Sequence, residues 1–217
     1  MRLLSLRNSS GFPLQILCLG AHSDDIEIGC GGTILRLAQQ FPDCVFHWVV
    51  FSAVGVRAAE AERAATLFVG SNTIQGPLLK AFQDGFMPFV GSELKTVFEE
   101  LKKEFSPDLI FTHNRKDAHQ DHRLLAELTW NTFRDHLILE YEIPKYDGDF
   151  GQPCVFVALE SDVCRRKVDY LMQSFPSQHT KHWFQADIFF SLMRLRGMEC
   201  KAPSGYAEAF YCHKLVL

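Results

Sequence analysis

The chain has 217 residues, which suffices for one sizeable hydrophobic core and is short for two. Its hydrophobic fraction of 47% and charged fraction of 22% are ordinary for a soluble globular protein. The formal net charge of −4 argues against nonspecific binding to nucleic acid, because such binding usually requires an excess of basic side chains. We therefore expect a single domain over residues 1–217 that binds small or neutral ligands.

The N-terminal residues 1–19 contain two arginines and a short apolar segment, as a signal peptide does. No small-residue cleavage site follows them, so we interpret the apolar segment as the first core strand. No stretch of the sequence approaches the roughly 20 consecutive apolar residues of a membrane-spanning helix. The seven cysteines form no CxxC pair and lie mostly among apolar residues, as reduced thiols do. The expected location is the cytoplasm.

Apolar runs of strand length alternate along the chain with segments of helical periodicity, as in βαβ units. The first run predicts a strand at Leu14–Leu19, followed by a helix over Gly29–Gln40. The next unit predicts a strand at Val45–Phe51 and a helix over Arg57–Val69 that Gly70 ends. This alternation favours an α/β fold with a parallel sheet.

The segment Ile74–Pro88 is rich in glycine, proline and aspartate, and we expect it to be irregular. Tyr146–Pro153 is expected to be a loop for the same reason. The remaining helices are predicted from Ser92, as an N-cap, to about Phe105, and over His122–Phe133, Asp162–Gln173 and Phe184–Leu195, the last of them ended by Gly197. The remaining strands are predicted at Leu109–Thr112, Leu137–Tyr141, Cys154–Leu159 and Ala209–Leu215.

Two polar segments directly follow predicted strands, where ligands gather in open α/β sheets. If the strands at Leu14–Leu19 and Leu109–Thr112 are close in the sheet, these segments meet. Burying their charges costs several kcal/mol unless a partner neutralises them, and a divalent metal ion is the natural partner. The first segment contains His22, Ser23, Asp24, Asp25 and Glu27. The second contains His113, Asn114, Arg115, Lys116, Asp117, His119, Gln120, Asp121 and His122.

Two histidines and one carboxylate form a familiar zinc-binding set that leaves one coordination position for water. Asp24 and Asp25 are adjacent in the sequence and cannot easily both point at one ion. One of them is therefore expected to bind the metal, and the other to accept a proton from the bound water.

Each segment also has a plainer interpretation. Asp24 and Asp25 are placed to cap a helix that opens near Ile26, where carboxylates satisfy free N–H groups. The histidines of the second segment are compatible with solvated surface positions. The glycines of the first segment do not match GxGxxG and follow an acidic cluster that would repel a pyrophosphate, so close packing of a helix on a strand explains them better. These glycines are Gly29, Gly31 and Gly32.

The segment AHSDDIEIGCGG, from Ala21 to Gly32, resembles the AHPDDxExGxGG signature of the PIG-L/LmbE-like zinc de-N-acetylases. The segment HQDHR, which begins at His119, is similar to the second motif of that family, HxDH. The similarity extends to the segments around Arg57 and Asp84 and to Tyr206–Phe210, and so covers nearly the whole chain. It implies a Rossmann-like α/β fold, with a mostly parallel sheet flanked by helices on both faces. It also implies removal of the acetyl group from an N-acetylated sugar, often N-acetylglucosamine in a conjugate.

The resemblance implies a role for each residue of the two motifs. Asp24 would be the general base. His119 would stabilise the negative oxygen that forms on the carbonyl and help the amine to leave, with Asp121 fixing the tautomer of His119 and raising its pKa. Zn²⁺ is the implied cofactor, and another divalent ion such as Fe²⁺ fits the same ligands. The implied metal ligands are His22, Asp25 and His122.

For the sugar, the resemblance implicates Arg57 and Asp84, with Asp84 accepting hydrogen bonds from hydroxyl groups. The alternative for Arg57 is an ion pair with Glu60 on the same helix face, worth roughly 0.3–0.5 kcal/mol. Several aromatic side chains would suit stacking on a sugar face, although most such rings belong to the core. They are Phe82, Phe86, Phe89 and Trp183.

Three functions of different classes are compatible with the sequence. The leading hypothesis is a zinc-dependent deacetylase acting on a small N-acetylated sugar substrate. The second is a metal hydrolase of another amide or of a phosphoester, which the lack of a phosphate-binding glycine loop disfavours. The third is a non-catalytic sugar-binding relative, which would need neither Asp24 nor His119. The sequence does not name the aglycone and leaves open whether the chain forms homo-oligomers.

Overall fold

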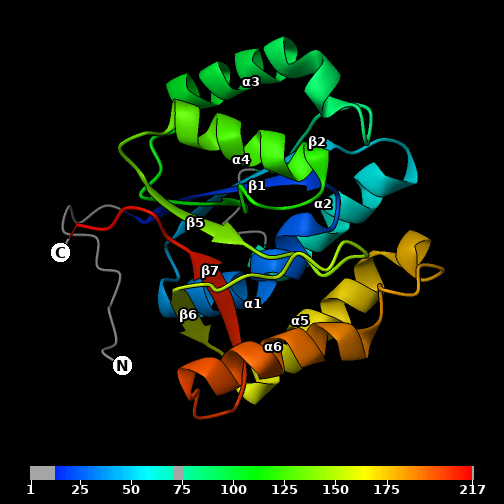
Figure 1. Ribbon diagram of the computed structural model, residues 1–217, viewed down its shortest axis with the longest axis vertical. Helices are drawn as coiled ribbons and strands as arrows, with labels where there is room; N and C mark the ends of the chain where they lie inside the picture. The colour runs from blue at the N-terminus through cyan, green and yellow to red at the C-terminus, as the bar shows by residue number, and fades with distance from the viewer. Residues whose placement is uncertain (1–12, 71–75, 217) are drawn as a thin grey trace.

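The computed structural model describes residues 13–70 and 76–216, which form one seven-stranded sheet with helices on both faces (Figure 1). The strands are β1 (Gln15–His22), β2 (Val45–Ser52), β3 (Leu78–Leu79), β4 (Leu109–His113), β5 (Leu137–Tyr141), β6 (Val155–Ala158) and β7 (Ala207–Tyr211). The helices are α1 (Asp25–Gln40), α2 (Val56–Val69), α3 (Gly91–Glu104), α4 (Gln120–Thr132), α5 (Ser161–Ser174) and α6 (Ala186–Cys200). Two short 3₁₀ helices are η1 (Met87–Val90) and η2 (Pro176–Gln178).

The strand order in the sheet is β3-β2-β1-β4-β5-β7-β6. The five strands from β3 to β5 are parallel, while β7 runs antiparallel to both β5 and β6. The predicted α/β fold with a mostly parallel sheet is therefore confirmed. The chain runs outward from β1 through β2 to β3 and then returns to β4 on the other side of β1. The carboxyl ends of β1 and β4 thus flank a topological switch point, where open α/β sheets bind ligands.

The two faces of the sheet carry separate hydrophobic layers because side chains alternate along each strand. On β1, Ile16 and Cys18 pack in the layer with α1, α2, α5 and α6, whereas Leu17 and Leu19 pack in the layer with α3 and α4. Figure 1 shows α3 and α4 above the sheet and the other helices below it. Both faces of the central strands are buried, which explains their nearly continuous apolar sequences.

Helix α1 lies so close to the sheet that its glycines have no room for a side chain. A Cβ atom on Gly29 would come within 2.2 Å of the Tyr141 ring, and one on Gly32 within 2.5 Å of Leu159. The carboxylate of Glu208 on β7 accepts hydrogen bonds from the backbone N–H groups of Gly32 (2.8 Å) and Thr33 (2.6 Å). The prediction that these glycines serve close helix packing is confirmed.

Two helices begin differently from the prediction. Helix α1 starts at Asp25 rather than Gly29, because Asp25 and Glu27 lie in its first turn, where acidic side chains favour the helix dipole. Helix α3 starts at Gly91, with Val90 at the N-cap, so the predicted capping by Ser92 is wrong. The 3₁₀ turn of η1 leads directly into α3 and replaces a side-chain cap.

The prediction that Gly197 ends the last helix is also wrong. Helix α6 continues through Gly197 to Cys200, and Lys201 closes it in the left-handed conformation. Gly197 is required instead for packing, because a Cβ atom there would lie 2.1 Å from the carbonyl oxygen of Gly205. The closing strand is β7. It ends at Tyr211, which is four residues before the predicted end.

The segment predicted to be irregular contains one short strand. Residues 74 and 75 of that segment, and residues 1–12 of the predicted N-terminal segment, lie outside the described residues. Within the rest, β3 pairs with β2 through Val49↔Leu78 and Val50↔Leu79. Two residues are too few to show strand periodicity, so the sequence pattern does not reveal them.

Two further properties concern the chain as a whole. None of the helices in the described ranges combines the length and apolar character needed to cross a membrane. All seven cysteines are free thiols, and four of them are buried. The latter fits the prediction of reduced cysteines in apolar surroundings.

We predict that Lys167→Ala destabilises the fold strongly. Lys167 Nζ donates to Glu208 Oε1 and to the carbonyl oxygen of Ile28, both at 2.6 Å, and both partners of the ion pair are buried. Removing one partner leaves a buried charge uncompensated, so the free energy of unfolding should fall by about 3–5 kcal/mol in urea titrations. The matched control Lys95→Ala, in an exposed pair with Glu99, should change it little. Equal effects of the two variants would contradict this role for Lys167.

Candidate active site

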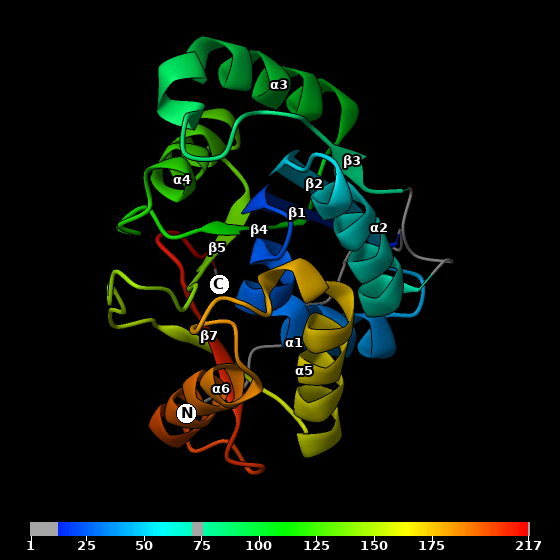
Figure 2. The same ribbon diagram turned by 90° about the vertical axis from the view of Figure 1, so that its right-hand side faces the viewer.

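The two polar segments meet at the carboxyl ends of β1 and β4, which are neighbours in the sheet. Figure 2 looks onto this end of the molecule. His22 is the last residue of β1, and Asp24 and Asp25 stand at the start of α1. His119 is the N-cap of α4, whose first turn contains His122. The fold therefore brings one strand end and two helix starts to the same place.

Three of these side chains converge with the spacing of a metal-binding set. His22 Nδ1 lies 3.2 Å from His122 Nε2 and 3.3 Å from Asp25 Oδ2, and His122 Nε2 lies 3.5 Å from Asp25 Oδ1. Ligand atoms placed tetrahedrally around a zinc ion are roughly 3.3 Å apart, given metal–ligand bonds of about 2.0–2.1 Å. The distances from His22 and from His122 involve different oxygens of Asp25, and the three side chains lie close enough together to bind one ion. His22 and His122 also form a possible metal-binding group with His119, and Asp25 and His122 form one with His113.

In both His22 and His122, the ring nitrogen that takes no part in this convergence faces a carboxylate. A carboxylate only accepts hydrogen bonds. His122 Nδ1 lies 3.1 Å from Asp117 Oδ2. His22 Nε2 lies 3.0 Å from Asp84 Oδ1 and 3.3 Å from Asp121 Oδ2. These carboxylates favour a proton on the nitrogen that they face, and a metal ion would then take the other nitrogen of each ring.

The electrostatics of this set favour a cation. Burial by itself would raise the pKa of Asp25, but the three histidines around it hold that pKa well below its usual range. Burial would likewise lower the pKa of His22, but the surrounding carboxylates raise it well above the ordinary value. Burial lowers the pKa of His122 to about 4, so this imidazole is neutral near pH 7.

Asp24 has a separate environment on the other side of the helix start. Its Oδ1 accepts from Arg57 Nη2 at 2.7 Å, and Arg57 Nη1 donates to Glu60 Oε2 at 3.0 Å. Asp24 Oδ2 has no hydrogen-bond partner within the described part of the chain. Burial raises the pKa of Asp24, and the charge of Arg57 opposes that rise. The two adjacent aspartates therefore differ in their partners and in the direction in which their pKa values are shifted.

The capping interpretation does not describe what these aspartates do. Asp24 occupies the N-cap position of α1, yet in the described structure its side chain makes no capping hydrogen bond. Asp25 Oδ2 accepts from the backbone N–H of His22 at 2.6 Å, which locks the turn between β1 and α1. The surface interpretation of the two histidines near the start of α4 is wrong for His122, which is buried, whereas His119 is partly exposed.

His119 and Asp121 contact each other differently from the implied arrangement. His119 Nδ1 accepts from the backbone N–H of Asp121 at 3.3 Å. The Asp121 carboxylate instead accepts from the backbone N–H groups of Gly85 (2.7 Å) and Met87 (3.2 Å) and faces His22. Burial and the nearby His22 lower the pKa of His119, outweighing the opposite effect of Asp121. A net rise in the pKa of His119 is therefore not found.

All eight residues predicted for the site form one connected cluster. Arg57 binds Asp24, and the predicted ion pair with Glu60 is also present. Asp84 is held at His22 although its side chain is 72% exposed. The His119 ring lies edge-on to His22, with 5.0 Å between the ring centroids. Proximity is thus established for every member, while the roles assigned to them stay predictions.

Two buried members of the first and second segments received no assigned role from the sequence. His113 Nε2 lies 3.2 Å from Asp25 Oδ2 and accepts from the backbone N–H of Ala21 at 3.0 Å. Its ring stacks on His122 with 3.9 Å between centroids, so it supports two of the metal-binding residues. Glu27 is fully buried, and burial raises the pKa of its carboxyl well above the usual value. It belongs with the core rather than with the ligands.

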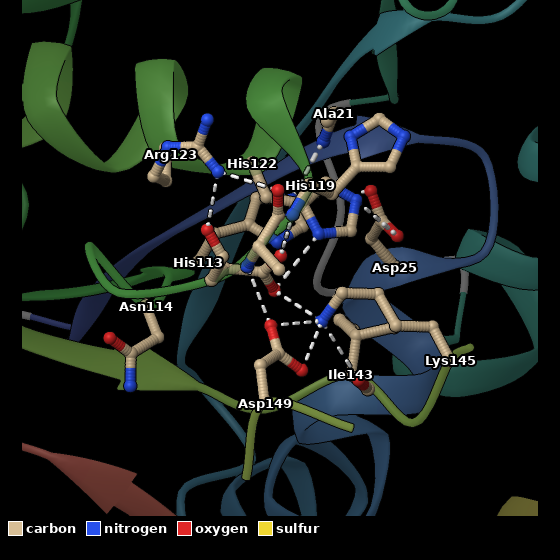
Figure 3. Close-up of polar contacts among 12 residues, drawn as sticks. Ala21, Asp25, His113, Asn114, His119, His122, Arg123, Ile143, Lys145 and Asp149 are labelled. Carbon is tan, nitrogen blue, oxygen red and sulfur yellow. Dashed lines mark hydrogen bonds and ion pairs between the residues drawn. The ribbon is translucent and has the colours of Figure 1, made fainter. Parts of the chain in front are cut away.

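The sequence also did not reveal a network of charged side chains next to His122. Asp117 accepts from His122 and lies 3.1 Å from Lys145 Nζ, while its Oδ1 accepts from the backbone N–H of His119 at 2.8 Å. Figure 3 shows Lys145 meeting Asp149, whose two oxygens lie 2.7 and 2.6 Å from Lys145 Nζ. Burial would raise the pKa of Asp117, but the hydrogen bond from His122 and nearby charges hold it below its usual range. Among the charged residues of this network, only Asp117 could have been found from the sequence, because it lies two residues before His119.

The fold and the site together define an α/β protein with a candidate divalent-metal centre at the topological switch point. The sequence model of the PIG-L family, described as GlcNAc-PI de-N-acetylase, matches residues 17–133, which is more than half of the chain. The chain belongs to the PIG-L family of deacetylases. Both polar segments lie within the matched region.

Individual proteins are similar to this chain over most of its length. The uncharacterized deacetylase YaiS of Escherichia coli (strain K12) is 26% identical over 171 residues, which cover 73% of this chain and 89% of that protein. The solved structure of N,N'-diacetylchitobiose deacetylase from Pyrococcus horikoshii has a TM-score of 0.71 at 18% identity, covering 92% of this chain and 83% of that one. The 4-carboxy-2-hydroxymuconate hydratase of Pseudomonas putida KT2440 has a TM-score of 0.68 at 17% identity, covering 94% and 98%. These two structures establish a shared fold.

We predict that Asp117→Asn weakens divalent-metal binding by roughly 10–100-fold, because the amide no longer fixes the proton on His122 Nδ1. Calorimetric titration with Zn²⁺ would measure the dissociation constant. Asp147→Asn, an exposed carboxylate in the same loop as Lys145, is the matched control and should bind as the wild type does. An unchanged dissociation constant in Asp117→Asn would contradict the orienting role.

Proposed function

We propose that this protein is a zinc-dependent hydrolase that removes the acetyl group from an N-acetylated sugar, of the N-acetylglucosamine type. The observation that carries the proposal is the convergence of His22, His122 and Asp25 next to a second buried carboxylate, Asp24, which is paired with Arg57 rather than with a histidine. A purely sugar-binding protein would need neither the metal set nor the separate carboxylate. Membership of a deacetylase family supports the reaction class.

Zn²⁺ bound to His22, Asp25 and His122 would lower the pKa of a bound water to about 7 and polarise the amide carbonyl. Asp24 accepts the proton of the attacking water at Oδ2, the oxygen that has no partner among the described residues. Arg57 holds the opposite oxygen, Oδ1, and so fixes the direction in which Oδ2 points. The raised pKa of Asp24 makes it a stronger base than an ordinary carboxylate.

His119 is suited to face the oxygen on which negative charge develops. Because its Nδ1 accepts the backbone N–H of Asp121, the proton of the neutral ring stands on Nε2 and is available for donation. Such a placed donor stabilises an oxyanion more in the transition state than in the substrate. Either His119 or the protonated Asp24 then returns a proton to the departing amine.

The sugar would contact the polar residues at the rim of the site. Asp84 is largely exposed yet fixed at His22, which suits a carboxylate that accepts hydrogen bonds from sugar hydroxyls. Arg57 is partly exposed at 21% and can add a donor. The similarity in fold to a diacetylchitobiose deacetylase is in keeping with a sugar substrate. The free thiols fit a reducing compartment such as the cytoplasm.

The alternative function, hydrolysis of phosphoesters, has less support. Around the metal set the nearest charged partners are carboxylates, namely Asp24, Asp84 and Asp121, which would repel a phosphate dianion. Arg57 is already engaged by two carboxylates. An uncharged acetamido group fits this acidic surrounding better.

Replacing a metal ligand should abolish metal binding. In His122→Ala, only two of the three ligands remain, so purified protein should contain far less than one equivalent of zinc by elemental analysis, whereas the wild type should approach one. His136→Ala, which alters a histidine at the other end of α4, should keep the wild-type content. Full zinc content in His122→Ala would refute the proposed ligand set.

Replacing the proposed base should lower the rate of the reaction without lowering the zinc content. We expect Asp24→Asn to lower kcat for amine release from N-acetylglucosamine conjugates by about 10²–10⁴-fold with zinc content retained. The exposed Asp43→Asn is the matched control and should keep wild-type kcat. Wild-type turnover by Asp24→Asn would show that another group acts as the base.

A further inference from the structure

Glu60 carries a fully buried carboxylate that lies outside the proposed metal set. It belongs to α2, three residues after Arg57, and three donors of the protein surround it. Its Oε2 accepts from Arg57 Nη1 at 3.0 Å and from Ser177 Oγ at 2.7 Å, and its Oε1 accepts from the backbone N–H of Ser177 at 2.9 Å. A buried carboxylate bonded in this way keeps its partners in place, because breaking the contacts would leave its charge unpaired.

Ser177 reaches Glu60 from a distant part of the chain. It lies in η2, shortly after α5, and α5 packs against α2 (Figure 2). The Ser177 hydroxyl also accepts from Gln178 Nε2 at 2.9 Å. The guanidinium of Arg57 lies over the ring of the nearby Phe175, with 5.4 Å between Arg57 Cζ and the ring centroid. This segment therefore restrains both Glu60 and Arg57.

These contacts decide how Arg57 meets Asp24. Arg57 Nη2 donates to Asp24 Oδ1 at 2.7 Å, while Asp24 Oδ2 has no hydrogen-bond partner among the described residues. An arginine and a carboxylate frequently form two parallel hydrogen bonds, and such a bidentate pair would engage both oxygens of Asp24. In this structure the other amino group, Arg57 Nη1, is engaged by Glu60 and lies 3.4 Å from Ser177 Oγ. The contact of Arg57 with Asp24 is therefore limited to one hydrogen bond.

Resting on the proposed function, we propose that Glu60 is a positioning residue for the reaction. By holding Arg57 Nη1, it prevents a bidentate pair between Arg57 and Asp24. Asp24 Oδ2 then stays available to accept the proton of the attacking water. Ser177 supports this role because it binds both carboxylate oxygens of Glu60. An ion pair that only stabilised the helix face would not affect Asp24 in this way.

A crystal structure of Glu60→Met tests the arrangement directly. Methionine is similar in length to glutamate but offers no strong acceptor, so Arg57 Nη1 should turn to Asp24 Oδ2 and approach it to about 3 Å. The contact of Arg57 Nη2 with Asp24 Oδ1 should persist. Glu60→Gln, which keeps the size of the side chain and loses its charge, is a second variant that disturbs the fold less. An Asp24 Oδ2 that stays without Arg57 as a partner in both variants would overturn the proposal.

The kinetic test uses amine release from N-acetylglucosamine conjugates. We expect Glu60→Met to lower kcat by about tenfold, because engagement of Asp24 Oδ2 slows the transfer of the proton. KM and zinc content should stay close to the wild-type values. The matched control is Glu62→Gln, which alters an exposed carboxylate on the same helix and should keep the wild-type kcat. A raised KM with unchanged kcat would mean that Glu60 serves sugar binding, and would overturn the proposal.

A double-mutant cycle shows whether Glu60 acts through Arg57. Arg57→Lys supplies a single ammonium group, which cannot form the bidentate pair. In that background Glu60→Met should lower kcat little further. Effects of the two substitutions that add in the double variant would indicate a general loss of packing, and the positioning role would be refuted.

The structural and kinetic readouts separate this proposal from the function on which it rests. If the wild type releases amine and Glu60→Met keeps the wild-type kcat, the positioning role is overturned and the deacetylase stands. If the zinc-loaded wild type releases amine from none of the conjugates, the proposed function is overturned, and with it the reaction that Glu60 would serve. The crystal structure of Glu60→Met would then still show whether Glu60 controls the pairing of Arg57 with Asp24.

Discussion

The arrangement of this protein depends on one buried carboxylate, Asp25, surrounded by three histidine rings. A carboxylate in the interior requires a positive partner, and nitrogen atoms of His22, His113 and His122 lie 3.2–3.5 Å from the Asp25 oxygens. Such a cluster is suited to a divalent cation. The neighbouring Asp24 is paired with Arg57 instead, in keeping with the proposal that the two aspartates have different roles.

Other contacts in the fold hold these charged side chains in position. Helix α1 carries both aspartates, and it is fixed to the sheet by glycines without room for side chains and by the buried pair of Lys167 and Glu208. At the start of α4, Asp117 and Lys145 hold His122 from behind. The side chains of the proposed metal site are thus held in place through α1 and through the start of α4, as precise placement of ligands requires.

The proposed function agrees with the charge of the site. Carboxylates and imidazoles line it, so a neutral polar group such as an amide would be favoured there over an anion. The loops of a fold vary more in length and sequence between proteins than its strands and helices do. Variation in the loops around this site would allow related chains to act on different conjugates.

The sequence by itself determined the α/β class, most strand positions and six residues of the predicted cluster, because apolar periodicity and two polar motifs are local signals. Arg57 and Asp84 were added by the resemblance to the family. It did not determine the start of α1, the strand β3 or the continuation of α6 through Gly197, where tertiary packing overrides local propensity. Only the tertiary structure decided that Asp121 serves His22 and the backbone at Gly85, and that Lys145 reaches Asp117. Those partners are far apart in the chain or belong to different loops, and their contacts depend on how the strands are ordered in the sheet.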